Sequence, residues 1–188
     1  MRITGGRFGG RVLKTPASRA IRPTADRLRE SLFNILVHRD DDPLQGAEVI
    51  DLFAGTGALG LEALSRGAAY ALFVDNGVEA RALLRANIDA LGAGGVTRIF
   101  RRDAARLGDA PQPGRFRLAF LDPPYGQGLA LPALHSLQDG GWLSQGALVI
   151  IEESIEVSLE LPDPFRFEQR RIYGDSQIVL ASFKPANL

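Results

Sequence analysis

Short apolar segments alternate with longer amphipathic segments over most of the chain. The apolar segments predict strands at 48–53, 70–75, 96–101, 116–121 and 147–152. The amphipathic segments predict helices at 58–66, 78–91 and near 129–138. Strands that are apolar on both faces are typical of parallel sheets that helices cover on both sides. The pattern therefore predicts an α/β fold, a Rossmann-like doubly wound sheet that is mainly parallel.

Both ends of the chain depart from this alternation. Residues 165–173 and 176–184 predict two strands, and Gly174-Asp175 between them is typical of a two-residue hairpin turn. Residues 2–14 predict two short extended pieces around a glycine-rich turn, and a helix follows for which Thr24 is a suitable N-cap. We therefore expect a C-terminal antiparallel β-hairpin on the sheet and an N-terminal β/helix extension.

The N-terminal extension is basic. Residues 1–39 carry nine basic and two acidic side chains, a net charge of +7, and the other 13 basic and 20 acidic side chains leave −7 for the rest. The helix pattern puts Leu28 and Leu32 on an apolar face and Arg29 elsewhere on the wheel. Segregated positive charge favours polyanion binding, although arginines also simply solvate exposed segments. We predict a basic extension at 1–42 and a main domain at 43–188.

Composition excludes several classes of protein. The 188 residues are 45% apolar, which suits one domain with a substantial core. No apolar run approaches the roughly 18 residues of a membrane span, and the N-terminus lacks the apolar stretch of a secretory signal. We therefore expect a cytoplasmic protein. With no cysteine and two scattered histidines, we expect no metal site.

A glycine-rich turn follows strand 48–53. Gly55-Thr56-Gly57-Ala58-Leu59-Gly60 matches G-x-G-x-x-G in the strand–turn–helix context in which helix amides bind nucleotides. Asp75 ends the next strand, where a carboxylate can accept both ribose hydroxyls. These features fit nicotinamide or flavin enzymes as well as S-adenosylmethionine enzymes.

Asp51 favours S-adenosylmethionine. It lies inside the strand, four residues before Gly55, where a dinucleotide fold needs an apolar side chain. A buried carboxylate is costly without a partner, and the ammonium group of methionine would supply one. The alternative is a carboxylate capped by loop amides. Asp103 and Ala104, after strand 96–101, would lie near the adenine. The predicted cofactor contacts are Asp51, Phe53, Gly55, Gly57, Asp75, Asn76, Asp103 and Ala104.

Asp122-Pro123-Pro124-Tyr125 follows strand 116–121, at the end that faces the ligand crevice in such sheets, and is the most specific motif. Its prolines fix two φ angles and remove two amide donors. An aromatic amine is a poor nucleophile, because its lone pair is delocalised. The Asp122 carboxylate and the Pro123 carbonyl could hold its N–H bonds and aim the lone pair at a sulfonium methyl. Tyr125 offers a face on which an extruded base can stack. The alternative is a rigid turn with a half-buried tyrosine.

These motifs resemble the class I methyltransferases that act on amino nitrogens and, more narrowly, the RsmD family of bacterial 16S rRNA guanine-N2 methyltransferases. The matching segments are Ile3-Thr4-Gly5-Gly6, Gly10-Arg11, Arg22-Pro23-Thr24, Asp26-Arg27, Arg29-Glu30, Leu32-Phe33-Asn34, the two motifs above and Arg171-Ile172-Tyr173-Gly174.

The resemblance implies methyl transfer from S-adenosylmethionine to the N2 of a guanine in 16S rRNA. It implies as partner the small ribosomal subunit or its assembly intermediate. Asp122 would hold the amine, and Pro123 and Tyr125 would shape the base pocket. The expected RNA contacts are Arg7, Arg11, Arg22, Asn34 and Pro124.

Other functions stay open at this point. The same chemistry could act on adenine N6 in DNA or RNA, or on a glutamine amide, although glutamine enzymes usually carry Asn in place of Asp122. A NAD-dependent oxidoreductase would explain the glycine turn but not Asp51 or Asp122. An RNA-binding assembly factor without activity would not need Asp122. Glu152 and Glu153 end strand 147–152; they could contribute to the cleft, but we expect them to be solvated.

Overall fold

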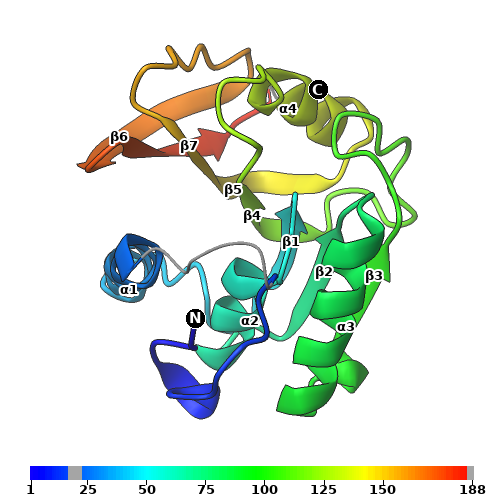
Figure 1. Cartoon of the computed structure of the whole chain (residues 1–188). Coiled ribbons are helices and arrows are strands. Elements are labelled where there is room, and N and C mark those ends of the chain that lie inside the picture. Colours follow the sequence, from blue (N-terminus) through cyan, green and yellow to red (C-terminus); the bar gives the residue numbers. More distant parts are fainter. Residues whose placement is uncertain (17–22, 186–188) are drawn as a thin grey trace.

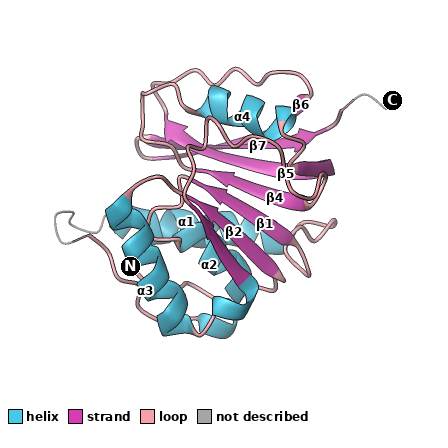
Figure 2. Ribbon diagram, turned by 90° about the vertical axis from the view of Figure 1, so that its right-hand side faces the viewer, coloured by secondary structure: helices cyan, strands magenta, loops and turns pink. Residues whose placement is uncertain are grey.

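The computed structural model describes residues 1–16 and 23–185, with the backbone alone for 23–25. Within these residues the centre is a seven-stranded sheet of order β3-β2-β1-β4-β5-β7-β6 (Figure 2). The strands are β1 (Glu48–Leu52), β2 (Tyr70–Val74), β3 (Thr97–Phe100), β4 (Phe116–Leu121), β5 (Leu143–Ser154), β6 (Phe165–Tyr173) and β7 (Ser176–Phe183). β1 to β5 pair in parallel, and β7 is antiparallel to β5 and β6. The predicted fold class is confirmed.

Helices cover both faces of the sheet (Figure 1). They are α1 (Pro23–Val37), α2 (Ala58–Ser65), α3 (Val78–Leu91) and α4 (Ala130–Asp139). Val49 of β1 packs in the apolar layer of α1, α2 and α3, and the next residue, Ile50, packs in the layer of α4. Because successive strand residues face opposite sides, burial on both faces explains the continuous apolar runs. Among the described residues, no helix combines the length and apolarity of a membrane span.

From the neighbouring strands β1 and β4, the chain extends the sheet toward opposite edges. From β1 it runs through α2 to β2, whereas from β4 it runs through α4 to β5, on the other side. Such a switch point opens a crevice at the carboxyl ends of the two strands. The register aligns Asp51 with Phe120 and Leu52 with Leu121. The loops that follow β1 and β4 therefore start side by side.

Some element boundaries differ from the predicted ones. β5 begins at Leu143 rather than at 147, and its pairing with β4 shifts register between Phe116 and Leu118. α1 begins at Pro23, so Thr24 lies within its first turn and is not the N-cap. Proline suits the first helical position, where its missing N–H leaves no hydrogen bond unmade. The predicted hairpin turn is confirmed, since Tyr173 pairs with Ser176.

The N-terminal segment folds back on itself and packs against α2. Arg2 and Val12 form a β-bridge around a 3₁₀ turn at Gly6–Phe8. Gly6 has φ +73°, and a Cβ there would lie 1.9 Å from the Ser65 carbonyl oxygen. Only glycine allows this close approach to α2. Ile3 is fully buried in the apolar layer that contains α1 and α2, so the extension shares its core with the main domain.

Candidate active site

A crevice opens where β1 and β4 end. From the β1 side its lining includes Asp51, Phe53 and Gly55, and from the β4 and β5 side Asp122 and Glu152. Arg29 of α1 and Met1, from the N-terminal part of the chain, also line the crevice. Residues predicted separately for the cofactor and for catalysis therefore line one cleft. Three carboxylates face it, with one guanidinium.

The turn between β1 and α2 depends on its glycines. Gly55 and Gly57 have φ of +55° and +80°, and Phe53 between β1 and the turn has +59°. A Cβ on Gly57 would lie 2.3 Å from Leu84 Cδ1 of α3. A Cβ on Gly60 would lie 2.4 Å from the Phe73 ring of β2. The glycines therefore let α2 start directly against its neighbours, with its amide end beside the crevice.

Asp75, at the end of β2, holds this turn. Its Oδ2 accepts from the Gly55 N–H at 2.9 Å, and its Oδ1 accepts from the Gly77 N–H at 2.7 Å. An ionised carboxylate oxygen can accept more than one hydrogen bond. The geometry therefore orients Asp75 and still allows the predicted ribose contact. Asn76 lies exposed beside it.

Asn87 of α3 ties the N-terminal segment to the glycine turn, and the sequence analysis missed it. Its side chain is 1% exposed. Its Oδ1 accepts from the Lys14 N–H at 2.7 Å, and its Nδ2 donates to the carbonyls of Lys14 at 3.1 Å and Thr56 at 2.9 Å. A polar residue on the buried face of an amphipathic helix is the signal that could have found it, because buried amides need partners.

Asp51 is the buried carboxylate at the floor of the crevice. Its exposed fraction is 1%, and its Oδ2 accepts from the Gly60 N–H at 2.9 Å. The alternative was capping by loop amides; the one backbone donor is instead the Gly60 N–H in the first turn of α2. This hydrogen bond is too weak to offset burial, which together with the negative charge of Asp75 raises the pKa of Asp51 to about 8. A cation placed beside Asp51 would stabilise its charged form.

β5 holds the Asp122-Pro123-Pro124-Tyr125 loop. The Tyr125 hydroxyl donates to Glu152 Oε1 at 2.6 Å and lies 2.9 Å from Ser176 Oγ. The Gly126 N–H donates to Glu153 Oε1 at 3.0 Å. Glu152 lines the crevice, in line with the cleft alternative, and Glu153 is fully buried, so the preferred expectation of solvation is wrong. Consecutive strand residues face opposite sides of the sheet, so Glu152 and Glu153 contact the loop from the two faces of β5.

Acidic side chains gather at the Asp122 end of the crevice. The Asp122 residue is exposed, and it lines the crevice. Loss of solvation, followed by the charges of Glu152, Asp51 and Glu153, raises the pKa of Asp122 well above its usual value. Burial also raises the pKa of Glu152, against the opposing effects of the Tyr125 hydrogen bond and Arg29. A positively charged ligand is the natural complement.

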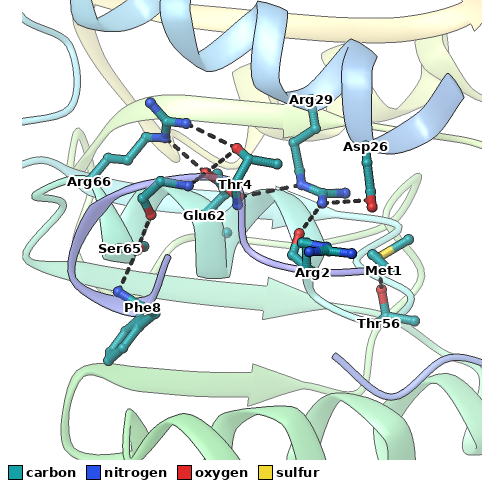
Figure 3. Close-up of polar contacts among 12 residues, drawn as sticks. Met1, Arg2, Thr4, Phe8, Asp26, Arg29, Thr56, Glu62, Ser65 and Arg66 are labelled. Atoms are coloured by element: carbon teal, nitrogen blue, oxygen red, sulfur yellow. Dashed lines mark hydrogen bonds and ion pairs between the residues drawn. The ribbon is translucent and has the colours of Figure 1, made fainter. Parts of the chain in front are cut away.

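Arg29 lies at the buried side of α1, contrary to the predicted position on the wheel. Its side chain is 3% exposed and pairs with Asp26 Oδ1 at 2.9 Å and Glu62 Oε2 at 3.4 Å, and it also donates to the Arg2 carbonyl (Figure 3). The prediction failed because Glu62 of α2, fully buried, is a partner far away in the sequence.

Other predicted residues lie outside the lining of the crevice. Asn34 lines a separate groove on α1, and Arg22 falls outside the described residues. Asp103 lies in an exposed turn, where its Oδ1 accepts from the Ala105 N–H, and Ala104 is buried. On the N-terminal segment, Arg7 is exposed over the Phe8 ring, while Arg11 donates to the Ala90 carbonyl. Pro123 is buried, and Pro124 is exposed.

The chain is similar to known proteins over most of its length. A family model described as conserved hypothetical protein 95 matches residues 1–182. The chain is 36% identical over 175 residues to ribosomal RNA small subunit methyltransferase D of Escherichia coli K12, which spans 93% of this chain and 85% of that protein. The chain belongs to the RsmD family. The resemblance seen in its motifs is confirmed. The protein of the same name from Haemophilus influenzae is 31% identical over 176 residues, 93% of this chain and 89% of that protein.

Solved structures share the fold of this chain. The Escherichia coli protein yhhF superposes with a TM-score of 0.82 at 33% identity and covers 98% of both chains. A SAM dependent methyltransferase from Aquifex aeolicus shares the fold, with a TM-score of 0.64 at 15% identity over 86% of this chain and 94% of that one.

Proposed function

We propose that this protein transfers a methyl group from S-adenosylmethionine to the exocyclic N2 of a guanine in 16S rRNA. Its substrate would be the small ribosomal subunit or an assembly intermediate, in the cytoplasm. The observation that carries the proposal is the single crevice in which Asp51 and the glycine turn meet Asp122. Membership of the RsmD family, with relatives named for methylation of small-subunit rRNA, supports the same activity.

The crevice fits the charge of the proposed cofactor. S-adenosylmethionine carries an ammonium group and a sulfonium centre, and the sulfonium supplies the methyl that is transferred. Asp51 has a pKa of about 8 and one backbone donor, so an ammonium group would relieve its burial. The Gly55 region offers close access at the start of α2, and Asp75 is oriented beside it. These residues would hold the methionine and ribose portions.

Asp122 would orient the amine that is methylated. Its carboxylate and the Pro123 carbonyl can accept the two N–H bonds of the amine, which leaves the nitrogen lone pair directed at the methyl group. Alignment of this kind is worth roughly 7–11 kcal/mol in favourable intramolecular reactions. The carboxylate also stabilises the positive charge that develops on nitrogen. Tyr125 is 38% exposed and its hydroxyl is held, so its ring can support a stacked base.

The acidity of the crevice disfavours the oxidoreductase alternative. Asp51, Asp122 and Glu152 all line it. A nicotinamide dinucleotide would bring an anionic pyrophosphate to the same turn, and like charges close together raise the cost of binding. An acidic lining instead matches a cationic cofactor.

The test is transfer of label from S-adenosylmethionine to small subunits that lack the modification. We expect one labelled nucleoside, N2-methylguanosine, by mass spectrometry of digested 16S rRNA. Free 16S rRNA and large subunits are the controls for substrate choice. Label in N6-methyladenosine, or in no nucleoside of the small subunit, would contradict the proposal.

A further inference from the structure

Glu152 stands beside the proposed amine site without a role in the proposed transfer. It lines the crevice together with Asp122, and its charge is the largest ionic influence on the pKa of Asp122, so the two carboxylates are neighbours. Its Oε1 accepts from the Tyr125 hydroxyl at 2.6 Å. In the described part of the chain, no donor contacts Oε2. One oxygen thus fixes the side chain and the other can accept from a ligand.

Arg29 partly offsets the effect of burial on the pKa of Glu152. The guanidinium lines the same crevice, and its positive charge opposes the effect of burial on the carboxyl group. Arg29 is itself fixed by Asp26 and Glu62. Glu152 is therefore held in place by the Tyr125 hydroxyl and lies near a fixed guanidinium that opposes the loss of its charge.

Nucleobase amines differ in the ring nitrogen beside them. Next to the N2 amine of guanine lies N1–H, a donor. Next to the N6 amine of adenine and the N4 amine of cytosine lies an unprotonated ring nitrogen, an acceptor. A charged carboxylate accepts only. The N2 amine of guanine also borders N3, an acceptor, so a carboxylate on the N1 side of the amine suits guanine and repels adenine and cytosine.

We propose that Glu152 accepts the N1–H of the flipped guanine while Asp122 holds the neighbouring amine, so that this pair of carboxylates selects guanine. The inference rests on the proposed function and adds to it a residue that determines base specificity. Sites that hydrogen-bond a substrate group reject analogues that lack it by about 10⁴-fold or more, because the buried polar group is left unpaired.

The test replaces the target guanosine with 2-aminopurine riboside in reconstituted small subunits. 2-Aminopurine keeps the amine but has an acceptor at N1. We expect the parent protein to methylate the guanosine subunits at least about 10³-fold faster in kcat/KM. In Glu152→Gln, the amide can donate to the N1 of 2-aminopurine, so we expect the preference for guanosine to fall by about 100-fold or more. Glu156→Gln removes an exposed carboxylate just after the end of β5 and should keep the parent's preference.

The outcomes separate this inference from the proposed function. If the parent forms no N2-methylguanosine on guanosine subunits, the proposed function fails. If the parent methylates guanosine and 2-aminopurine equally well, Glu152 does not read N1–H, whatever the variant does. The inference would also be overturned if Glu152→Gln, folded and able to bind S-adenosylhomocysteine, kept the parent's preference for guanosine over 2-aminopurine. A loss of base preference confined to Glu152→Gln would support it.

Discussion

Two buried carboxylates of this protein, Glu62 and Asp51, differ in the number of their hydrogen-bond donors. Glu62 in α2 is fully buried and saturated: it accepts from the backbone and hydroxyl of Thr4, from the Gly5 N–H and from Arg29 and Arg66 (Figure 3). In the crevice, Asp51 accepts from one backbone amide, and its pKa rises to about 8. A carboxylate with many hydrogen-bond donors stabilises the fold, whereas a buried carboxylate with one donor can bind a cationic ligand.

The largest effect on stability is expected at Glu62. Glu62→Ala should lower the free energy of unfolding by about 3–5 kcal/mol, because Arg29 and the first residues of the chain lose a buried partner. Denaturant unfolding measures the change. Glu62→Gln keeps an acceptor oxygen and should cost less. Folded Glu62→Ala should bind S-adenosylhomocysteine nearly as well as the parent. A loss of stability below about 1 kcal/mol would mean that Glu62 does not hold the N-terminal segment and α1 in place.

Asp51 should behave in the opposite way. Asp51→Asn should weaken S-adenosylhomocysteine binding by about 10–100-fold, the worth of a hydrogen bond to a charged group. The affinity of the parent should rise with pH as Asp51 ionises around its pKa of about 8. Calorimetry between pH 6 and 9 measures the affinities of the parent and of Asp51→Asn. Ionisation of the ligand affects both proteins equally, so it cancels when they are compared. An equal pH dependence in parent and variant would show that Asp51 does not meet the ammonium group.

The same substitution should change the pH dependence of stability. Folded Asp51 keeps its proton to a higher pH than it does in the unfolded chain. Without ligand, the free energy of unfolding of the parent therefore loses a contribution as the pH rises from about 4 toward about 8. Asp51→Asn lacks this loss, so it should be more stable than the parent at pH 8 and the difference should shrink toward pH 5. Urea titrations at pH 5 and pH 8 measure the difference in stability between the two proteins. A difference that is larger at pH 5 than at pH 8 would contradict this prediction.

The sequence could predict the features that depend on local interactions. Strand ends and glycine turns are local patterns, so the sequence alone was enough to place Asp51, Gly57 and Asp122. Glu62 was missed because its donors lie up to 58 residues away. A signal existed, since it is the one charged side chain of the apolar helix Ala58–Ser65. Glu152 could have been predicted too, because it lies near the carboxyl end of the strand next to β4.

A smaller effect is expected from the basic N-terminal segment. Arg7 is exposed and lies over the Phe8 ring, where it can meet a phosphate. Arg7→Ala should reduce the slope of log affinity against log salt for small subunits by about 1, with little change in methylation at saturation. Exposed Arg117, in the first half of β4, is the matched control and should leave the slope unchanged. Equal slopes in both variants and parent would remove Arg7 from the RNA contacts.

The most direct test of the crevice compares cofactor binding and methyl transfer in Asp122→Ala. Asp122 makes its proposed contribution through the amine, so the variant should bind S-adenosylhomocysteine within a few-fold of the parent. Its single-turnover rate of methyl transfer to guanine in small subunits should fall by at least about 100-fold. A folded variant that binds the ligand and methylates at the parent's rate would contradict the account.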